Sequence, residues 1–201
     1  MNGPIIAITG TPGVGKTRLS FLIKKKCGCA KVVEINKILL SHNAFSGVDE
    51  SGAKIADMPR LNRAVAKELL RYSKRSCAIV LVGHLAPELK LKYDMAIVLR
   101  SSLKKLEARL EKRGYSRKKI SENLIAEGLD YCGESISKKC AEVYEVETAS
   151  QINWAVNRML EICMGKRLRV KEGAAGNIRA NTAIDKTGEL YWMLKAGRII
   201  Q

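Results

Sequence analysis

One segment combines glycines, a lysine and a threonine at a spacing that binds phosphate. It reads GTPGVGKT from Gly10 and satisfies the pattern G-x-x-x-x-G-K-[ST]. Glycines such as Gly13 and Gly15 let backbone N–H groups turn toward phosphate oxygens, and a following helix adds its positive N-terminal end. Lys16 can reach the β- and γ-phosphates, and the Thr17 hydroxyl can ligate Mg²⁺. The motif predicts a nucleoside triphosphate site and leaves the acceptor open.

A second group of residues suits the transfer of a phosphoryl group. Arg109 and Arg113 lie four residues apart on one face of a predicted helix, and three more basic residues follow Gly114. Arginines neutralise the charge that spreads over a transferred phosphoryl group, and a cover hinged at Gly114 would exclude water. A solvated basic helix is the alternative, but beside a phosphate loop we interpret both arginines as catalytic candidates.

The two histidines differ in position. His84 follows an apolar run at the carboxyl end of a predicted parallel strand, where α/β proteins collect ligands. It could orient an attacking water or sense the nucleotide, and a purely structural histidine is the alternative. His42 lies in a polar stretch and receives no role.

The elements that must position these residues alternate along the chain. Short apolar runs predict strands at Pro4–Thr9, Lys31–Glu34, Ala78–Val82 and Met95–Leu99. Helical periodicity follows Gly15 and covers Leu61–Ser73, Leu103–Arg113 and, more weakly, Arg117–Cys140. Glu142–Thr148 predicts a final strand and Ile152–Met164 a closing helix. We therefore expect a three-layer α/β P-loop NTPase fold with a central parallel sheet.

Composition limits the class of protein. The chain has 201 residues, 46% of them hydrophobic and 28% charged, which fits one compact domain rather than a disordered or multidomain chain. Its net charge of +16 suggests nucleic acid, nucleotides, anionic lipid or an acidic protein as partner. Because no apolar run approaches the roughly 18–20 residues that cross a bilayer and no signal peptide is recognised, we expect a cytoplasmic protein without a membrane partner.

The cysteines and the C-terminal region leave alternatives open. The six cysteines form no C-x-x-C pair, so reduced thiols are expected, with a redox or metal pair of Cys27 and Cys29 as the alternative. Residues 1–164 read as one P-loop domain, and residues 165–201 read as an extension with 8 basic and 3 acidic residues. In that extension, LYWML could pack back as a strand, or the basic start could be a mobile arm.

Three segments together resemble an archaeal member of the adenylate kinase isoenzyme 6 family. They are GTPGVGKT after the first strand, GHLAPE around His84, and RLEKRGYSRKKISENLIAE from Arg109. The likeness runs from about Ile5 to Met164. It implies a nucleoside monophosphate kinase-like fold with a short lid, ATP and Mg²⁺ as cofactors, and AMP or a similar monophosphate as acceptor.

The resemblance also implies roles for residues and partners. Val33–Ala56 would cover the acceptor, Lys112–Glu122 would form the lid, and His84 matches a histidine tied to ATPase activity. Arg113 matches a nucleotide-binding arginine of the lid. The residues that would line the ATP phosphates are Gly13, Gly15, Lys16, Thr17 and Arg18. The expected partners are a ribosomal protein of the small-subunit platform and the 3′ end of small-subunit rRNA.

One residue departs from the family pattern. Val82 stands two positions before His84, where relatives usually carry an acidic residue. Either Thr17, phosphates and waters hold Mg²⁺, helped by Asp57 or Asp49, or catalysis is weak.

Three hypotheses follow from the sequence. The first is ATP-dependent phosphoryl transfer to AMP, with ATPase activity. The second is an RNA-bound assembly factor whose nucleotide state gates release of a ribosomal partner. The third is a kinase for another small acceptor with no ribosomal role.

Overall fold

A five-stranded parallel sheet lies at the centre of the computed structural model, which describes residues 3–50, 52–140, 142–147, 149–165 and 186–195. The strand order is β2-β5-β1-β6-β7, and every neighbouring pair is parallel. The strands are β1 (Ile5–Thr9), β2 (Ala30–Glu34), β5 (Ala78–Val82), β6 (Met95–Leu99) and β7 (Val143–Val146). The predicted parallel sheet is therefore confirmed.

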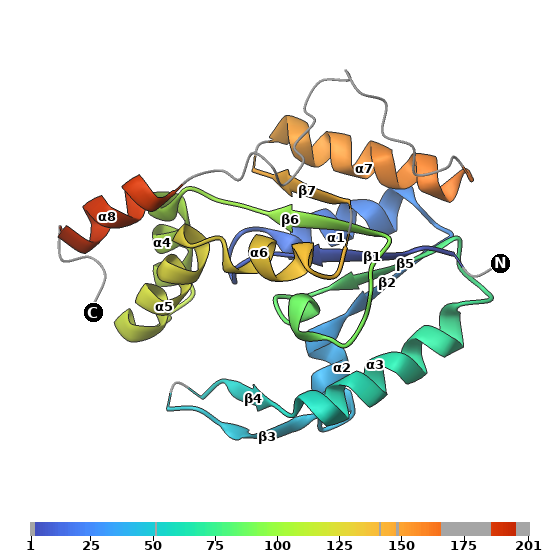
Figure 1. Ribbon diagram of the computed structural model, residues 1–201, viewed down its shortest axis with the longest axis horizontal. Coiled ribbons are helices and arrows are strands. Elements are labelled where there is room, and N and C mark those ends of the chain that lie inside the picture. The colour runs from blue at the N-terminus through green and yellow to red at the C-terminus, as the bar shows by residue number, and fades with distance from the viewer. Residues whose placement is uncertain (1–2, 51, 141, 148, 166–185, 196–201) are drawn as a thin grey trace.

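Helices cover both faces of this sheet, which makes the three predicted layers (Figure 1). Because side chains alternate along a strand, Ile6 and Ile8 join the hydrophobic cluster formed with α1, α4, α5 and α7, whereas Ala7 joins the cluster formed with α2, α3 and α6. The helices are α1 (Lys16–Lys26), α2 (Ile35–Ser41), α3 (Met58–Tyr72), α4 (Leu103–Lys112), α5 (Arg117–Gly128), α6 (Tyr131–Ser137) and α7 (Ala149–Cys163). A short 3-10 helix, η1 (Ala86–Glu88), follows β5.

The single helix predicted over Arg117–Cys140 is wrong, because the structure divides it into α5 and α6. Asp130 separates them in the left-handed backbone region at φ 52°. Its side chain accepts a hydrogen bond from the Gly133 N–H and so caps α6. The weak helical period of this segment reflects that break.

A small hairpin stands apart from the main sheet (Figure 1). It pairs β3 (Phe45–Val48) with β4 (Lys54–Ala56) in antiparallel fashion. The hairpin lies within the segment 33–56 that the family resemblance linked to the acceptor. Its exposed side chains alternate with only partly buried ones, so the sequence carries little strand signal.

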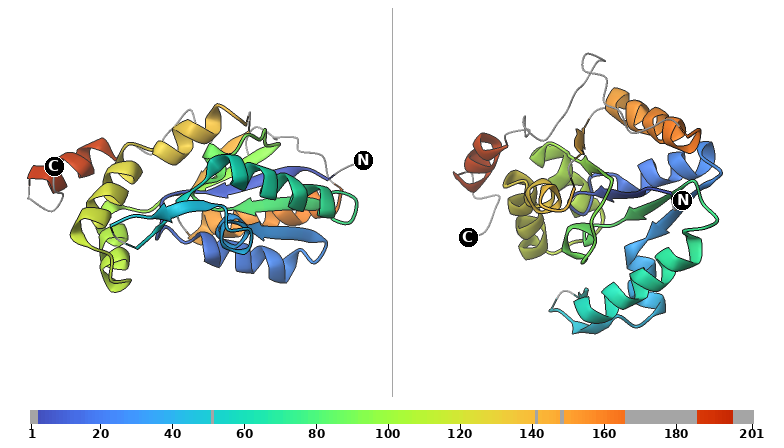
Figure 2. Two further views of the ribbon diagram at one scale, coloured as in Figure 1. Left: turned by 90° about the horizontal axis from the view of Figure 1, so that it is seen from below. Right: turned by 45° about the vertical axis from the view of Figure 1, so that its right-hand side comes forward.

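The described part of the C-terminal extension packs against the main body of the protein instead of pairing as a strand. LYWML lies within the helix α8 (Thr187–Lys195), which packs beside α5 (Figure 2). Leu190 is buried there against Gly128. The strand predicted for LYWML is therefore wrong, and the basic start of the extension lies outside the described residues, which resume at Lys186.

The expectation that all cysteines are reduced thiols is also wrong. A disulfide joins Cys29 to Cys77, 48 residues apart, so Cys29 does not pair with Cys27. The two residues precede β2 and β5, which are neighbours in the sheet, and the Cys77 N–H donates to the Cys29 carbonyl. Parallel pairing brings the two thiols together. Among the described helices, none has the length and apolar character needed to cross a membrane.

Candidate active site

The loop between β1 and α1 has a backbone that only glycine accommodates well. Gly10, Gly13 and Gly15 adopt φ values of 129°, 98° and 114°. A Cβ atom on Gly10 would lie 2.3 Å from the Leu99 carbonyl oxygen, and one on Gly13 would lie 2.8 Å from a methyl group of Leu106. The first and second glycines are therefore fixed by close packing as well as by conformation.

Lys16 begins α1, and its side chain turns back over this loop. Its Nζ donates to the carbonyls of Gly10 at 2.5 Å and Thr11 at 3.0 Å. Burial lowers the pKa of Lys16 to about 8, and the positive charge of Arg113 adds to that effect, while Cys132 and Glu127 oppose it. The ammonium group is thus held at the loop and poorly solvated, which favours an anionic ligand.

Thr17 and Arg18 follow in the first turn of α1, and both side chains are exposed. A hydroxyl oxygen at this place, together with phosphate oxygens and water, is a donor set that suits Mg²⁺. Val82 is buried in the core and contributes no oxygen. The residues therefore fit a magnesium ion held by Thr17 and ligand oxygens.

The two carboxylates considered as additional ligands have partners of their own. Asp57 caps α3 by accepting from the Arg60 N–H at 2.9 Å, and it pairs with the Arg60 guanidinium at 3.2 Å. Asp49 accepts from the Ala53 N–H and lies 3.6 Å from the Lys119 ammonium. These contacts stabilise the helix start and the hairpin turn.

Arg109 and Arg113 lie at the end of α4 nearest the loop. The Arg109 guanidinium donates to the Gly13 carbonyl and to the Ser101 hydroxyl, both at 3.3 Å, so it braces the loop backbone. Arg113 is exposed at the C-terminus of α4, near enough to Lys16 to influence its pKa. Gly114 then turns the chain toward α5 at φ 72°. The structure thus brings both predicted arginines to the phosphate loop.

His84 follows β5 at the same edge of the sheet and is half-buried. Burial, together with the positive charges of Lys16 and Lys119, lowers its pKa to about 4. The imidazole is therefore neutral near pH 7 and retains a lone pair that can accept a proton or hydrogen bond. His84 thus lies just beyond the carboxyl end of a parallel strand, close enough to Lys16 for the lysine charge to affect its pKa.

The start of α5 contacts the tip of the β3–β4 hairpin. Lys118 pairs with Glu50 at 3.1 Å, and Lys119 pairs with Asp49. The segment expected to form the lid, Lys112–Glu122, therefore contacts the segment expected to cover the acceptor, Val33–Ala56. Since Lys118 and Glu50 are solvent-exposed, their ion pair adds little stability and can open readily.

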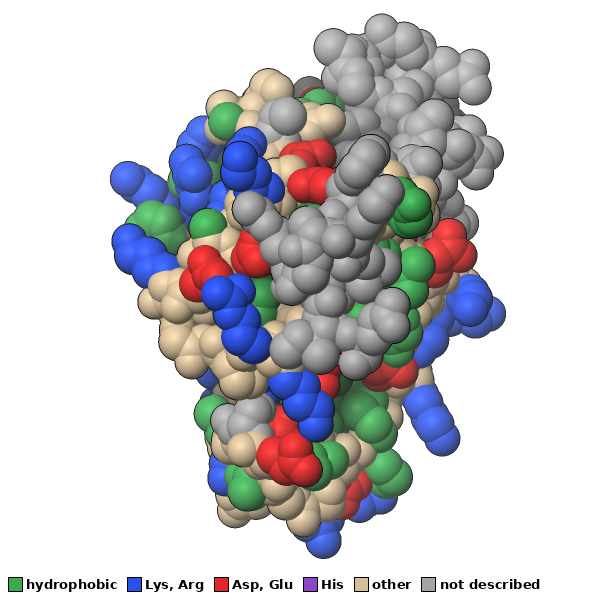
Figure 3. Space-filling model, turned by 90° about the vertical axis from the view of Figure 1, so that its left-hand side faces the viewer, with side chains coloured by type: hydrophobic (Ala, Val, Ile, Leu, Met, Phe, Trp, Pro, Cys, Tyr) green, Lys and Arg blue, Asp and Glu red, His purple; other side chains and the backbone are tan. Residues whose placement is uncertain are grey.

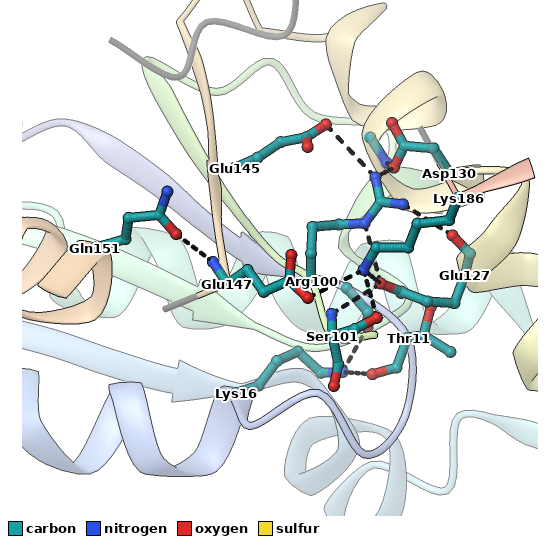
Figure 4. A network of polar contacts seen from close by, with 12 residues as sticks. Thr11, Lys16, Arg100, Ser101, Glu127, Asp130, Glu145, Glu147, Gln151 and Lys186 are labelled. Atoms are coloured by element: carbon teal, nitrogen blue, oxygen red, sulfur yellow. Dashed lines mark hydrogen bonds and ion pairs between the residues drawn. The ribbon is translucent and has the colours of Figure 1, made fainter. Parts of the chain in front are cut away.

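Glu127 of α5 forms the centre of a buried polar network that the sequence did not reveal (Figure 4). One carboxylate oxygen accepts from the Thr11 hydroxyl of the phosphate loop at 2.7 Å. The other accepts from Arg100 Nε and from the Ser101 N–H, both at 3.0 Å. Glu127 therefore ties the phosphate loop to the end of β6.

Arg100 continues the network toward α6 and β7. It is 2% exposed, and its guanidinium pairs with Asp130 and, at 3.5 Å, with Glu145. Burial alone would lower the pKa of Arg100, but Glu127 and Asp130 outweigh it and raise that pKa. Burial raises the pKa of Asp130 to about 6 against the opposing effect of Arg100.

The extension supplies a second cation to this network. Lys186 is 4% exposed, and its Nζ donates to the Ser101 carbonyl and pairs with Glu127 at 3.2 Å and Glu147 at 3.6 Å (Figure 4). The Glu189 carboxylate of α8 accepts from the Lys104 N–H in the first turn of α4 at 3.1 Å. The extension thus completes the surroundings of the phosphate loop. No local spacing in the sequence signals contacts between residues 59 or 85 positions apart.

Charges of both signs mix at the end of the molecule that carries α4, α5 and α8. Blue and red side chains are interspersed over the coloured part of this face (Figure 3). Arg117 and Glu111, 3.0 Å apart, form one such pair. The net positive charge does not form a uniform patch on this visible surface.

Known proteins share the sequence and the fold. A family model described as an AAA domain matches residues 6–130. A Methanosarcina acetivorans protein named "Putative adenylate kinase" is 33% identical over 186 residues, covering 87% of this chain and 96% of its own. A Methanocaldococcus jannaschii protein of the same name is also 33% identical, covering 82% and 88%. Shikimate kinase from Acinetobacter baumannii shares the fold with a TM-score of 0.53 at 12% identity, covering 83% and 96%. The chain belongs to the P-loop kinase family that these archaeal relatives represent.

Proposed function

We propose that this protein transfers the γ-phosphoryl group of ATP to AMP, forming two molecules of ADP. The observation that carries the proposal is the convergence of Lys16, Arg109, Arg113 and His84 on one glycine-rich loop. The curated relatives are named for adenylate kinase activity, which supports AMP as the acceptor. The touching lid and hairpin support a site that closes over two nucleotides.

Each residue has a separate task in this proposal. Gly13 and Gly15 present backbone N–H groups to the phosphates, and Lys16 leaves its loop carbonyls to bind the β- and γ-phosphates. Arg109 positions the loop through the Gly13 carbonyl, whereas Arg113 binds nucleotide and neutralises charge that develops during transfer.

Thr17 and His84 also have proposed roles in phosphoryl transfer. Thr17 would hold Mg²⁺, which when bound supplies positive charge on the phosphates, and Arg18 lies beside it in the same turn. Neutral His84 has one N–H, which can donate to the ionised phosphate of AMP during transfer. Its other ring nitrogen can accept a hydrogen bond from water during ATP hydrolysis, so the site also supports ATPase activity.

Nucleotide turnover with Mg²⁺-ATP, measured with and without AMP, tests the proposal. We expect AMP-dependent ADP formation, and we expect Lys16→Ala to reduce it by about 10²–10³-fold. Lys25→Ala is the matched control, because Lys25 is exposed at the opposite end of the same helix. If Lys16→Ala retained the activity, the site assignment would be wrong. If ADP formed only with another small acceptor, that molecule would replace AMP as the proposed substrate.

We further propose that nucleotide turnover serves maturation of small-subunit rRNA, with a platform ribosomal protein as partner. The resemblance of the lid and histidine segments to the isoenzyme 6 family and the net charge of +16 support this role. Binding to an rRNA fragment should weaken as salt rises. Binding that does not respond to salt would contradict a role for the net positive charge.

A further inference from the structure

Four cysteines gather at the end of the sheet opposite the phosphate loop. Cys27 follows α1, Cys29 precedes β2, Cys77 precedes β5, and Cys163 ends α7. We call these four residues the thiol cluster. They come from three separate stretches of the sequence. Neither the phosphate loop nor the Glu127 network uses any of them.

Three sulfur atoms of the thiol cluster are close enough to share one ligand. Those of Cys29, Cys77 and Cys163 all lie within 4.8 Å of one another. The Cys29 Sγ is also 3.8 Å from the Cys163 carbonyl oxygen. Cys27 is the candidate for a fourth ligand, because it is buried in the hydrophobic cluster against which Cys163 packs.

We propose that the thiol cluster, once its disulfide is reduced, binds one thiophilic divalent cation such as Zn²⁺. Four sulfur ligands at about 2.3 Å from a tetrahedral ion lie roughly 3.8 Å from one another. Cys29, Cys77 and Cys163 require only small side-chain movements to reach that arrangement, and Cys27 would have to turn toward them as the fourth ligand. An all-sulfur set selects zinc-like ions over Mg²⁺, which prefers oxygen, so this ion would not compete with the one at Thr17.

Burial and exposure in the cluster suit such a site. Cys27 is buried at 2% exposure, whereas Cys29 is exposed and gives an ion a path of entry. A cation that binds a cysteine replaces the proton of its thiol, because the thiolate is the ligand. Metal binding must therefore release protons, and affinity must rise with pH.

The disulfide and the metal are alternative occupants of the cluster, because the S–S bond engages Cys29 and Cys77. A water-soluble trialkylphosphine converts one form into the other. It takes up oxygen from water to become the phosphine oxide, and the S–S bond gives two S–H groups. The oxidised protein should therefore bind the cation much more weakly than the reduced protein.

Cobalt binding tests the proposal directly. Protein reduced with the phosphine and desalted under argon is titrated with Co²⁺, whose tetrahedral thiolate complexes absorb strongly in the visible region. We expect one equivalent of Co²⁺ per chain and displacement of Co²⁺ by Zn²⁺. Binding of Zn²⁺ should also raise the unfolding midpoint by about 5–10 °C. The disulfide form should give neither absorption nor a shift in midpoint.

Single substitutions identify the ligands. Cys77→Ser and Cys163→Ser should each weaken Co²⁺ binding by at least about tenfold, since each removes one anionic ligand. Cys140→Ser is the matched control, because Cys140 is buried elsewhere, beside the Glu142 carbonyl. For the wild-type protein, X-ray absorption should give four sulfur neighbours near 2.3 Å from zinc.

Two results would overturn the proposal without depending on a variant that folds. One is a reduced wild-type protein with native circular dichroism that takes up no Co²⁺ at a 1:1 ratio. The other is a bound zinc ion with fewer than three sulfur neighbours. Retained binding in a folded Cys77→Ser, Cys163→Ser double variant would contradict it equally.

Discussion

The two ends of the parallel sheet carry different chemistry. At the carboxyl ends of β1, β5 and β6, the chain places left-handed glycines, Lys16, His84 and the charged network around Glu127. At the amino ends of β2 and β5 the chain places the sulfur atoms of Cys29 and Cys77. The N-terminus of α1 points to the first region, whereas its last turn, with three lysines, lies beside the second. One sheet can therefore hold an anion at one end and thiolates at the other, and a change at one end should leave the other intact.

The largest stability effect should come from Glu127→Ala. This change leaves Arg100 and Lys186 buried without the carboxylate that they share, and it removes the partner of Thr11. Breaking a buried ion pair in this way costs about 3–5 kcal/mol in the free energy of unfolding. Urea denaturation measures the loss. The control Glu134→Ala, an exposed residue of α6, should lose little, and an equal loss in both variants would contradict a central role for Glu127.

Reduction of the Cys29–Cys77 disulfide should have the next largest effect, at the other end. In the presence of a chelator, we expect the free energy of unfolding to fall by about 2–4 kcal/mol, because the unfolded chain regains freedom. We expect kcat and KM for nucleotide to stay unchanged. The same treatment should not affect a Cys29→Ser, Cys77→Ser variant. A change in kcat on reduction would show that the two ends are coupled.

Sequence patterns could find the first region only in part. The phosphate loop, the buried strands β5 and β6, and the helices that bear Arg109 and Arg113 each have a local signal of glycine spacing or apolar periodicity. The Glu127 network has none, because Arg100 and Glu127 are 27 residues apart and pair only after α5 packs beside β6. The sequence places both of them within ordinary strand-end and helical stretches.

The second region was hidden for a similar reason. Cys29 and Cys77 become neighbours through the parallel register of β2 and β5, in which Ala30 pairs with Ala78. Without the strand order, the C-x-C spacing of Cys27 and Cys29 was the visible pattern, and it did not indicate the disulfide between Cys29 and Cys77. The sequence also did not predict that LYWML is helical, because five consecutive apolar residues do not distinguish a strand from a short helix.

A smaller effect is expected from Lys186→Met, which separates the extension from the phosphate loop. Methionine keeps much of the volume and removes the charge that pairs with Glu127. Since Glu127 holds the Thr11 hydroxyl, we expect a severalfold rise in KM for ATP with little change in kcat. Lys105→Met, on the exposed face of α4, is the matched control. Steady-state kinetics over an ATP series gives both constants, and an unchanged KM would leave Lys186 with a structural role alone.

The most specific effect concerns the charge on Lys16. Its pKa of about 8 in the free protein means that part of the population is neutral just above neutral pH. Bound phosphates favour the charged form, so the pKa rises on binding and the protein takes up a proton. Affinity should then be constant below pH 8 and fall as pH rises above it, by about tenfold from pH 7 to pH 9. Nucleotide phosphates are ionised throughout most of this range, so their own titration contributes little.

Calorimetry at pH 8 in two buffers of different ionisation enthalpy measures the proton uptake. Lys16→Arg keeps its charge at every pH used and should show no uptake, whereas reduction of the thiol cluster should leave the uptake unchanged. Equal uptake by the wild type and Lys16→Arg would place the titrating group elsewhere.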